Sequence, residues 1–116
     1  MKKADAIAAL AALAQDNRLD VFRLLVQAGP DGMPAGAVAA AVGLAPNALT
    51  FHFGRLRDAG LVTVRRDGRS MIYAARFEAM NGLLAFLGEN CCQGAAELCV
   101  PVVCKPARAK KLKETA

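Results

Sequence analysis

The chain has 116 residues, of which 55% are hydrophobic, and it carries a formal net charge of +5. This length fits one small domain that buries only part of its surface, so a dimer would stabilise it. No apolar run approaches the roughly 18 residues of a membrane span, which predicts no membrane partner. Asp5 and the helical spacing of the alanine-rich N-terminus argue against a signal peptide, so we expect a cytoplasmic protein.

The positive charge is concentrated in two stretches. Residues 55–76 hold six arginines against two aspartates, and residues 105–116 hold five basic residues against one acid. Residues 77–104 hold three glutamates and no lysine or arginine. Positive regions on a small chain favour a nucleic-acid partner, although a solvated surface and a disordered tail would give the same composition.

Hydrophobic spacing and capping residues predict five helices. Asp16 or Asn17 is the expected cap of the second helix, and Gly29-Pro30 ends it. The third and fourth helices are joined by the tight turn GLAPN, which is typical of a helix-turn-helix. The expected helices cover residues 4–14, about 17–28, 35–42, 46–59 and 77–87.

After Gly60 the apolar spacing changes from that of helices to that of strands. Two short apolar runs flank the sequence RRDGRS, and its Asp67-Gly68 pair is a strong hairpin signal. A basic hairpin directly after a helix-turn-helix is typical of a winged helix. We therefore expect a mainly α fold with a small β-hairpin (α+β), arranged as a winged helix-turn-helix.

All four cysteines lie near the C-terminal end, at Cys91, Cys92, Cys99 and Cys104. Thiolates select soft metals and metalloids, and clustered cysteines in a reducing compartment favour a metal or redox site over disulfides. Adjacent cysteines on a regular helix point about 100° apart, so they do not converge on one ion. We therefore expect the last helix to end near Gly88 and the cysteines to lie on a non-helical arm.

Three stretches of the chain resemble the ArsR/SmtB family of bacterial winged-helix metalloregulators. They read LAQDNRLDVFRLL, AVGLAPNALTFHFGRLRDAGLV and RRDGRSMIYAA. The resemblance implies a homodimeric repressor that leaves its operator DNA when an ion binds. It also implies a dimer interface built from the first and last helices, whose apolar stripes here include Leu10, Leu13, Leu83, Leu84 and Leu87.

The cysteine positions resemble those of one group within this family, the arsenic-responsive repressors with a C-terminal Cys-Cys pair and a further cysteine. The resemblance implies that trivalent arsenic, with antimonite as a second inducer, is bound by Cys91, Cys92 and a third thiol. We expect Cys99 rather than Cys104 to be that third ligand. Methylated arsenicals, cadmium, lead, a structural zinc site, a disulfide-based oxidation sensor, inert cysteines and a simple arsenic buffer are the alternatives.

The N-terminal part of the fourth helix is the expected recognition helix, which meets base edges in the major groove. Asn47 can bond adenine, Thr50 offers a hydroxyl and a methyl, and Phe51 suits thymine methyl groups unless it belongs to the core. His52 occupies the position of the family's histidine, where we expect a surface or phosphate contact. The predicted phosphate or minor-groove contacts are Arg55, Arg65, Arg66 and Arg69, and the predicted core face is Leu49, Phe53 and Leu56.

These assignments divide the chain into three parts. Residues 1–88 form the winged helix-turn-helix and dimerisation domain, residues 89–104 the inducer-binding segment, and residues 105–116 a basic disordered tail. The sequence has one histidine and no recognisable phosphate loop or catalytic triad, so an enzyme is not expected. The predicted function is an arsenite-responsive repressor that binds an inverted repeat in double-stranded DNA.

Overall fold

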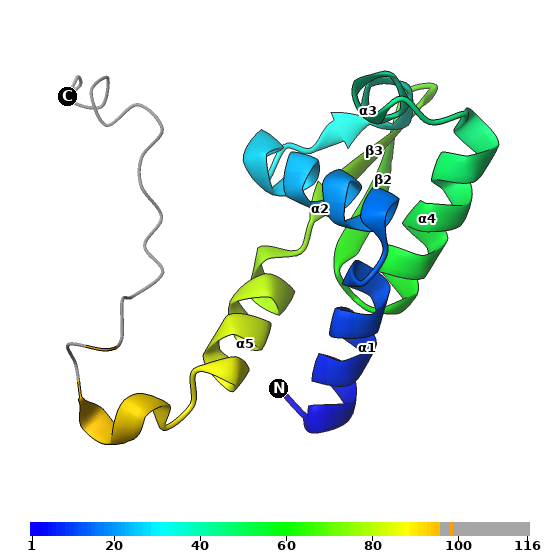
Figure 1. The fold of residues 1–116 in the computed structure, drawn as a ribbon. Coiled ribbons are helices and arrows are strands. Elements are labelled where there is room, and N and C mark those ends of the chain that lie inside the picture. Colours follow the sequence, from blue (N-terminus) through cyan, green and yellow to red (C-terminus); the bar gives the residue numbers. More distant parts are fainter. Residues whose placement is uncertain (96–97, 99–116) are drawn as a thin grey trace, which may run out of the picture.

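The computed structural model describes residues 1–95 and residue 98 of the chain (Figure 1). Within that part, no single helix is long and apolar enough to cross a membrane; only the third and fourth helices together, bent by 107°, meet that length and composition. The five expected helices are confirmed. They are α1 (Lys3–Leu13), α2 (Asp16–Ala28), α3 (Ala35–Val42), α4 (Pro46–Asp58) and α5 (Phe77–Leu87).

Two long strands, β2 (Val62–Asp67) and β3 (Ser70–Ala75), form the expected antiparallel hairpin. Asp67 pairs with Ser70, so the two-residue loop is Gly68-Arg69 and Asp67 belongs to the strand. A third strand completes a sheet of order β1-β3-β2. This is β1 (Met33–Pro34), which lies between the second and third helices, where no strand was expected.

The short strand β1 depends on a glycine beside it. Met33 lies opposite Tyr73, and Pro34 lies opposite Ile72. Gly32 has a φ of 75°, and a Cβ there would collide with the carbonyl oxygen of Tyr73. Only glycine tolerates both the positive φ and this close approach. The approach brings the α2–α3 connection against the hairpin.

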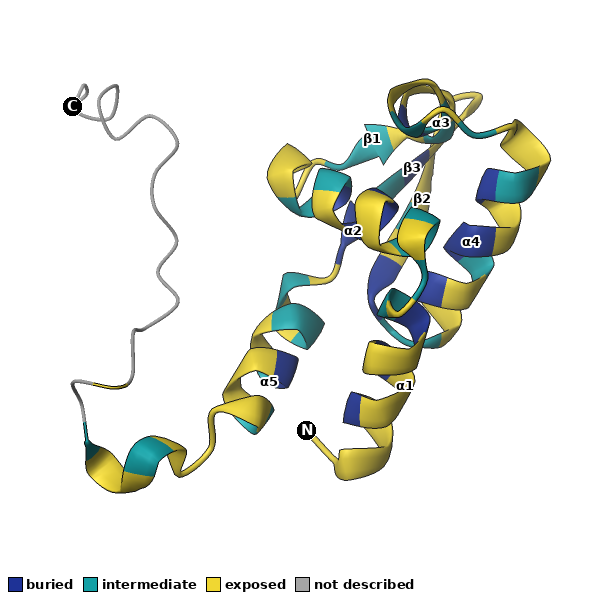
Figure 2. Cartoon of the chain, in the orientation of Figure 1, coloured by how far each residue is buried: buried dark blue, intermediate teal, exposed yellow. Residues whose placement is uncertain are grey.

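The core lies where α2, α3 and α4 pack against one face of the sheet (Figure 2). The predicted core face of α4 is confirmed, because Leu49, Phe53 and Leu56 are all buried. The spacing of Leu19, Phe22, Leu25 and Val26 predicts one buried stripe on α2, but Leu19 is 44% exposed, so this prediction is wrong at its first position. The larger side chains with almost no exposed surface are Phe53, Leu25, Leu49, Leu56, Leu61, Val21, Val38 and Val62.

Helix α1 buries alanines on one side and leaves two of its large apolar side chains exposed. Ala6 and Ala9 face the core, where they join a cluster that includes Leu83 of α5. Ile7 and Leu10 are 56% and 43% exposed. Alanine lets the helix lie close to its neighbours, so the bulky side chains are left on the outer surface.

Candidate nucleic-acid interface and thiol segment

The helix-turn-helix consists of α3, a turn at Gly43 and α4. Gly43 has a left-handed φ of 72° and ends α3, while Pro46 occupies the start of α4, where its missing N–H is no loss. The outward side of α4 carries three of the predicted base-contacting residues, Asn47, Thr50 and Phe51, all of them exposed. The structure therefore brings these three side chains onto one accessible surface.

Phe51 lies on this surface and not in the core. Its side chain is 56% exposed. The guanidinium carbon of Arg55 lies 5.3 Å from the centre of its ring, within the range of a cation–π contact. The ring also meets the His52 ring edge-on, with centroids 5.6 Å apart. Phe51 is therefore held between a cation and an aromatic neighbour, with much of its ring open to solvent.

His52 corrects one prediction. It was expected on the surface, but it is only 8% exposed. Its Nδ1 lies 3.4 Å from Nη1 of Arg18 on α2, a distance at which neutral Nδ1 accepts a hydrogen bond. Burial, and then the nearby positive charge of Arg18, lower the pKa of His52 below its ordinary value. His52 is thus an interior residue and not the surface residue expected, and its lowered pKa favours the neutral imidazole.

Arg18 has a structural role that sequence patterns did not indicate. Its backbone N–H donates to Oε1 of Gln15 at 2.9 Å, which makes Gln15, and not Asp16 or Asn17, the cap of α2. Its Nε donates to the carbonyl of Ala12 at 2.6 Å. Through these bonds and its contact with His52, Arg18 joins the end of α1, the start of α2 and the recognition helix.

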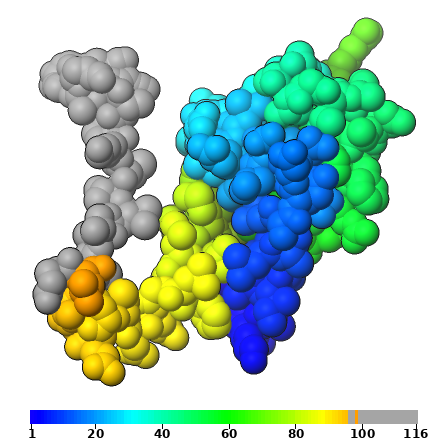
Figure 3. Space-filling view, in the orientation of Figure 1, coloured from blue at the N-terminus to red at the C-terminus, as the bar shows by residue number. Residues whose placement is uncertain are grey.

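The hairpin tip projects from the body of the molecule (Figure 3). Arg66 and Arg69 lie there and are exposed, which suits the predicted contact with DNA backbone or minor groove. Arg65 is also exposed, but its Nη2 donates to the carbonyl of Asp31 at 3.1 Å. Arg65 therefore braces the wing against the α2–β1 loop, a role that the sequence did not indicate.

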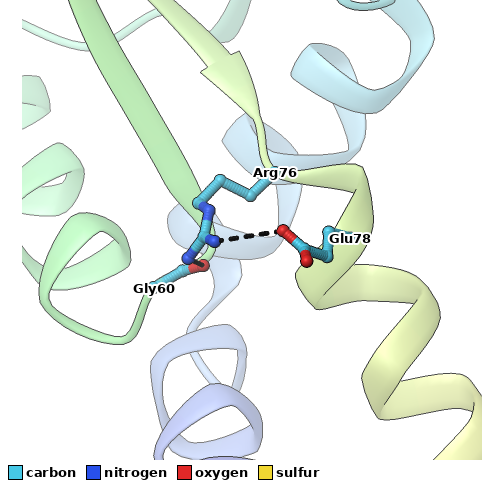
Figure 4. A network of polar contacts seen from close by, with 3 residues as sticks. All are labelled: Gly60, Arg76 and Glu78. Carbon is cyan, nitrogen blue, oxygen red and sulfur yellow. Dashed lines mark hydrogen bonds and ion pairs between the residues drawn. The ribbon is translucent and has the colours of Figure 1, made fainter.

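Two further contacts connect the recognition helix to the rest of the fold. The rings of Phe53 on α4 and Tyr73 on β3 are stacked, with centroids 3.5 Å apart and planes 6° from parallel. Arg76 donates from Nη1 to the carbonyl of Gly60 at 3.2 Å and pairs with Glu78 at 3.4 Å (Figure 4). Because Glu78 is 89% exposed, this ion pair adds little stability, but it links the end of α4 to the start of α5.

The thiol segment, which is the predicted inducer-binding segment of residues 89–104, follows α5. This helix ends at Leu87 with Gly88 as its C-cap, so its predicted end near Gly88 is confirmed. Cys91 and Cys92 lie in a short 3-10 turn, η1 (Cys91–Gly94), in which Cys92 has a left-handed φ of 50°. The Cys92 thiol donates to the carbonyl of Ala95 at 3.0 Å. Cys99 and Cys104 lie outside the described residues. Within those residues no group of three or more potential ligands is arranged to hold a metal.

The predicted dimer residues fall into two classes. Leu10, Leu84 and Leu87 are 43%, 41% and 59% exposed, so they are available to a second molecule. Leu13 is partly buried against the core of its own chain. Leu83 is 6% exposed and belongs to that core, so the single chain already buries it.

Comparisons with known proteins identify the family. Residues 13–65 match a family described as "Helix-turn-helix domain". The HTH-type transcriptional regulator YgaV of Escherichia coli K12 is 33% identical over 87 residues, which are 75% of this chain and 86% of YgaV. The chain belongs to the ArsR family of winged helix-turn-helix transcriptional regulators. It is therefore a DNA-binding regulator and not an enzyme.

Two solved structures support this assignment. A homodimeric winged helix-turn-helix DNA-binding domain from Mycobacterium bovis, Mb0332, is 26% identical with a TM-score of 0.60, over 74% of this chain and 80% of that one. Reduced HlyU from Vibrio cholerae is also 26% identical with a TM-score of 0.60, over 78% of this chain and 92% of HlyU. The family and the fold expected from the sequence are confirmed, while the inducer is not addressed by these relatives.

Proposed function

We propose that this ArsR-family regulator is a dimeric repressor that trivalent arsenic, or antimonite, releases from its operator. The observation that carries the proposal is the placement of every cysteine between residues 91 and 104, directly after α5. A soft ion bound there would act on the segment that continues from the dimerisation helix. The recognition helix contains no thiol, so sensing and DNA contact use different residues.

The chemistry of the segment fits a thiophilic acceptor. Cys91 is exposed and Cys92 is partly exposed, so both can be reached from solvent. The chain around them has already left the α-helical conformation, which removes the 100° divergence of neighbouring helical side chains. Cys99 or Cys104 would supply a third thiolate. A three-thiol set of this kind suits trivalent arsenic better than hard ions such as magnesium or calcium.

A second copy of the chain is the proposed partner of the outer face of α1 and α5. Ile7, Leu10, Leu84 and Leu87 are all large, apolar and more than 40% exposed on these two helices. Soluble monomers rarely expose apolar surface of this kind in one place. The M. bovis relative is described as homodimeric, which supports a dimer for this chain as well.

The connection from sensor to DNA would run through α5. The thiol segment continues from the C-terminal end of α5, and Arg76 ties the N-terminal end of that helix to Gly60 beside α4. Binding that orders the thiol segment would favour one placement of α5 and, with it, one spacing of the two recognition helices. Couplings of about 1–3 kcal/mol are typical of such linked sites.

The test measures operator affinity by fluorescence anisotropy with the reduced full-length dimer, with and without arsenite. We expect arsenite to lower the affinity and Cys91→Ser or Cys92→Ser to abolish this response. Methylarsenite, antimonite, cadmium and lead are compared in the same titration to rank inducers. Arsenite binding without any specific DNA binding would instead indicate a thiol buffer.

Oxidation is the second candidate signal, because the HlyU relative was solved in a state named as reduced. Adjacent thiols together with further cysteines nearby could form a disulfide when oxidised. Hydrogen peroxide added without a metalloid separates this possibility from arsenic sensing. Release by peroxide but not by arsenite would favour the redox function.

A further inference from the structure

We infer that this regulator selects thymine in its operator half-sites by contact between the Phe51 ring and the thymine 5-methyl group, with Thr50 as a second apolar contact. The inference rests on the proposed function, because it requires a specific operator. It assigns the base that the recognition helix prefers, and the residue that sets this preference.

The argument begins with what a phenyl ring can recognise. Phe51 lies on the outward side of α4, one position after Thr50 and one helical turn beyond Asn47, and is 56% exposed. Phenylalanine has no hydrogen-bond donor or acceptor, so it distinguishes base pairs only by apolar contact and shape. In the major groove, the only apolar group that a standard base presents is the 5-methyl of thymine. A recognition helix that carries Phe51 therefore favours thymine.

Thr50 points to the same base for a separate reason. Its Oγ1 donates to the carbonyl of Pro46 at 2.9 Å, so its hydroxyl proton is already used within the helix. What remains for DNA is the methyl group and the oxygen lone pairs. Asn47 is suited to bidentate bonding with adenine, the partner of thymine in a base pair. All three exposed residues therefore favour contact with A·T base pairs.

Arg55 keeps the Phe51 ring in place. It follows Phe51 by four residues on the same helix, and its guanidinium carbon lies 5.3 Å from the ring centre. Contact with a cation restricts the ring before DNA arrives, which lowers the entropy lost on binding. The guanidinium N–H groups that do not face the ring are suited to a phosphate.

The experiment uses deoxyuridine, which pairs like thymine but lacks its methyl group. An operator is first selected from a random duplex library with the full-length protein, and each half-site thymine is then replaced singly by deoxyuridine. At the contacted position we expect wild-type affinity to fall about fourfold per methyl, and about fifteenfold when both half-sites are changed. Deoxyuridine at flanking positions should leave the affinity unchanged.

Protein variants test whether Phe51 is the residue that contacts the thymine methyl group. Phe51→Ala should bind the thymine operator more weakly and lose its discrimination between thymine and deoxyuridine, whereas Phe51→Leu should keep part of it. Leu19→Ala, at an apolar position of similar exposure on α2, is the matched control and should discriminate like wild type. Thermal melting checks that each variant folds.

The outcomes separate the inference from the function it rests on. A selected operator that tolerates deoxyuridine at every position, or has no thymine in its half-sites, overturns the inference and leaves the repressor intact. If Phe51→Ala still discriminates between thymine and deoxyuridine, another residue sets the preference, and the inference is again overturned. If the library yields no preferred sequence at all, the proposed repressor function fails, and the inference fails with it.

Discussion

Arg18 and His52 meet across 34 residues of sequence, with Nη1 of the arginine 3.4 Å from Nδ1 of the buried imidazole. The contact requires an imidazole that is unprotonated at Nδ1. The same arginine bonds the carbonyl of Ala12 at 2.6 Å, so one guanidinium group positions both α1 and the recognition helix. The histidine therefore contributes to the placement of α4 from inside the protein.

This arrangement predicts lower stability in mild acid. Because the folded pKa of His52 is lowered, the unfolded chain takes up a proton at a higher pH than the native protein does. Stability should be intact above the unfolded pKa of about 6.5 and should decline as the pH falls below it. Urea unfolding of the full-length protein between pH 5 and pH 8 measures the effect.

The control for the acid effect is His52→Gln, which keeps a polar side chain but cannot be protonated. This variant should show a smaller loss of unfolding free energy between pH 7 and pH 5 than wild type. An equal loss in both proteins would assign the acid sensitivity to other groups.

The local parts of the fold could be predicted from the sequence because their signals are local. Gly60 marks the change from helical to strand spacing, and the Asp67-Gly68 pair marks the hairpin. The strand Met33–Pro34 could not be predicted, since it is two residues long and exists only through its pairing with Tyr73 and Ile72. The helices and hairpin needed no knowledge of distant contacts, whereas this strand did.

In the candidate site, too, the features set by local spacing could be predicted, and the contacts between residues remote in sequence could not. The exposure of Asn47, Thr50 and Phe51 follows from the helical spacing of α4 around its buried leucines. The surface position expected for His52 came from the family resemblance and not from spacing, because His52 lies three residues after Leu49 and four before Leu56, on the buried face of α4. Its contact with Arg18 could not be predicted, since Arg18 is remote in sequence. On α1, both faces are apolar, and only the close packing of alanines decides that Leu10 faces outward.

The thiol segment gives a prediction that separates sensing from DNA binding. Cys91→Ser and Cys92→Ser should each leave operator affinity intact and abolish its loss on adding arsenite, because neither residue lies on the recognition surface. Anisotropy titrations with and without arsenite measure both quantities. Comparing Cys99→Ser with Cys104→Ser then identifies the third ligand. If Cys104→Ser lost the response to arsenite while Cys99→Ser kept it, Cys104 and not Cys99 would be the third ligand.

We predict that the protein dimerises through the outer face of α1 and α5, and that one charged side chain placed on this face weakens the dimer. Leu84 is 41% exposed in one chain, so Leu84→Glu should leave the protomer folded but place a charge in the interface. Sedimentation should show a larger monomer fraction, and operator affinity should fall with it. Leu19→Glu, at a residue with 44% exposure on α2, is the control and should remain dimeric. A wild-type protein that stays monomeric at micromolar concentration would refute the dimer.

We predict that Arg66 of the wing, the β2–β3 hairpin, contacts the DNA backbone and strengthens binding to any DNA sequence. Arg66 is exposed near the hairpin tip, and its side chain makes no hydrogen bond to another described residue. Arg66→Ala should weaken operator and random duplexes alike and reduce the slope of log affinity against log salt by about one. Lys3→Ala, at the start of α1, is the control and should leave the slope unchanged. A loss confined to the operator would show that Arg66 reads bases.

We predict that Gly54→Ala is more stable than the wild-type protein but binds operator DNA less tightly. Gly54 lies inside α4, one turn beyond Thr50 and Phe51, and a Cβ added there would meet no atom of the protein within 4 Å. Gly54→Ala should therefore raise the unfolding free energy by up to about 1 kcal/mol through helix propensity. The added methyl group also stands on the surface proposed to face DNA, so operator affinity should fall.

Urea unfolding and anisotropy on the same preparation measure the two effects of Gly54→Ala. Gly82→Ala on α5 is the matched control, because its added Cβ would lie at an ordinary 3.5 Å from Met1 Cε and away from the recognition helix. It should gain stability and keep its operator affinity. Because no internal contact requires glycine at position 54, a stabilised Gly54→Ala with unchanged operator affinity would mean that this part of α4 does not approach the DNA.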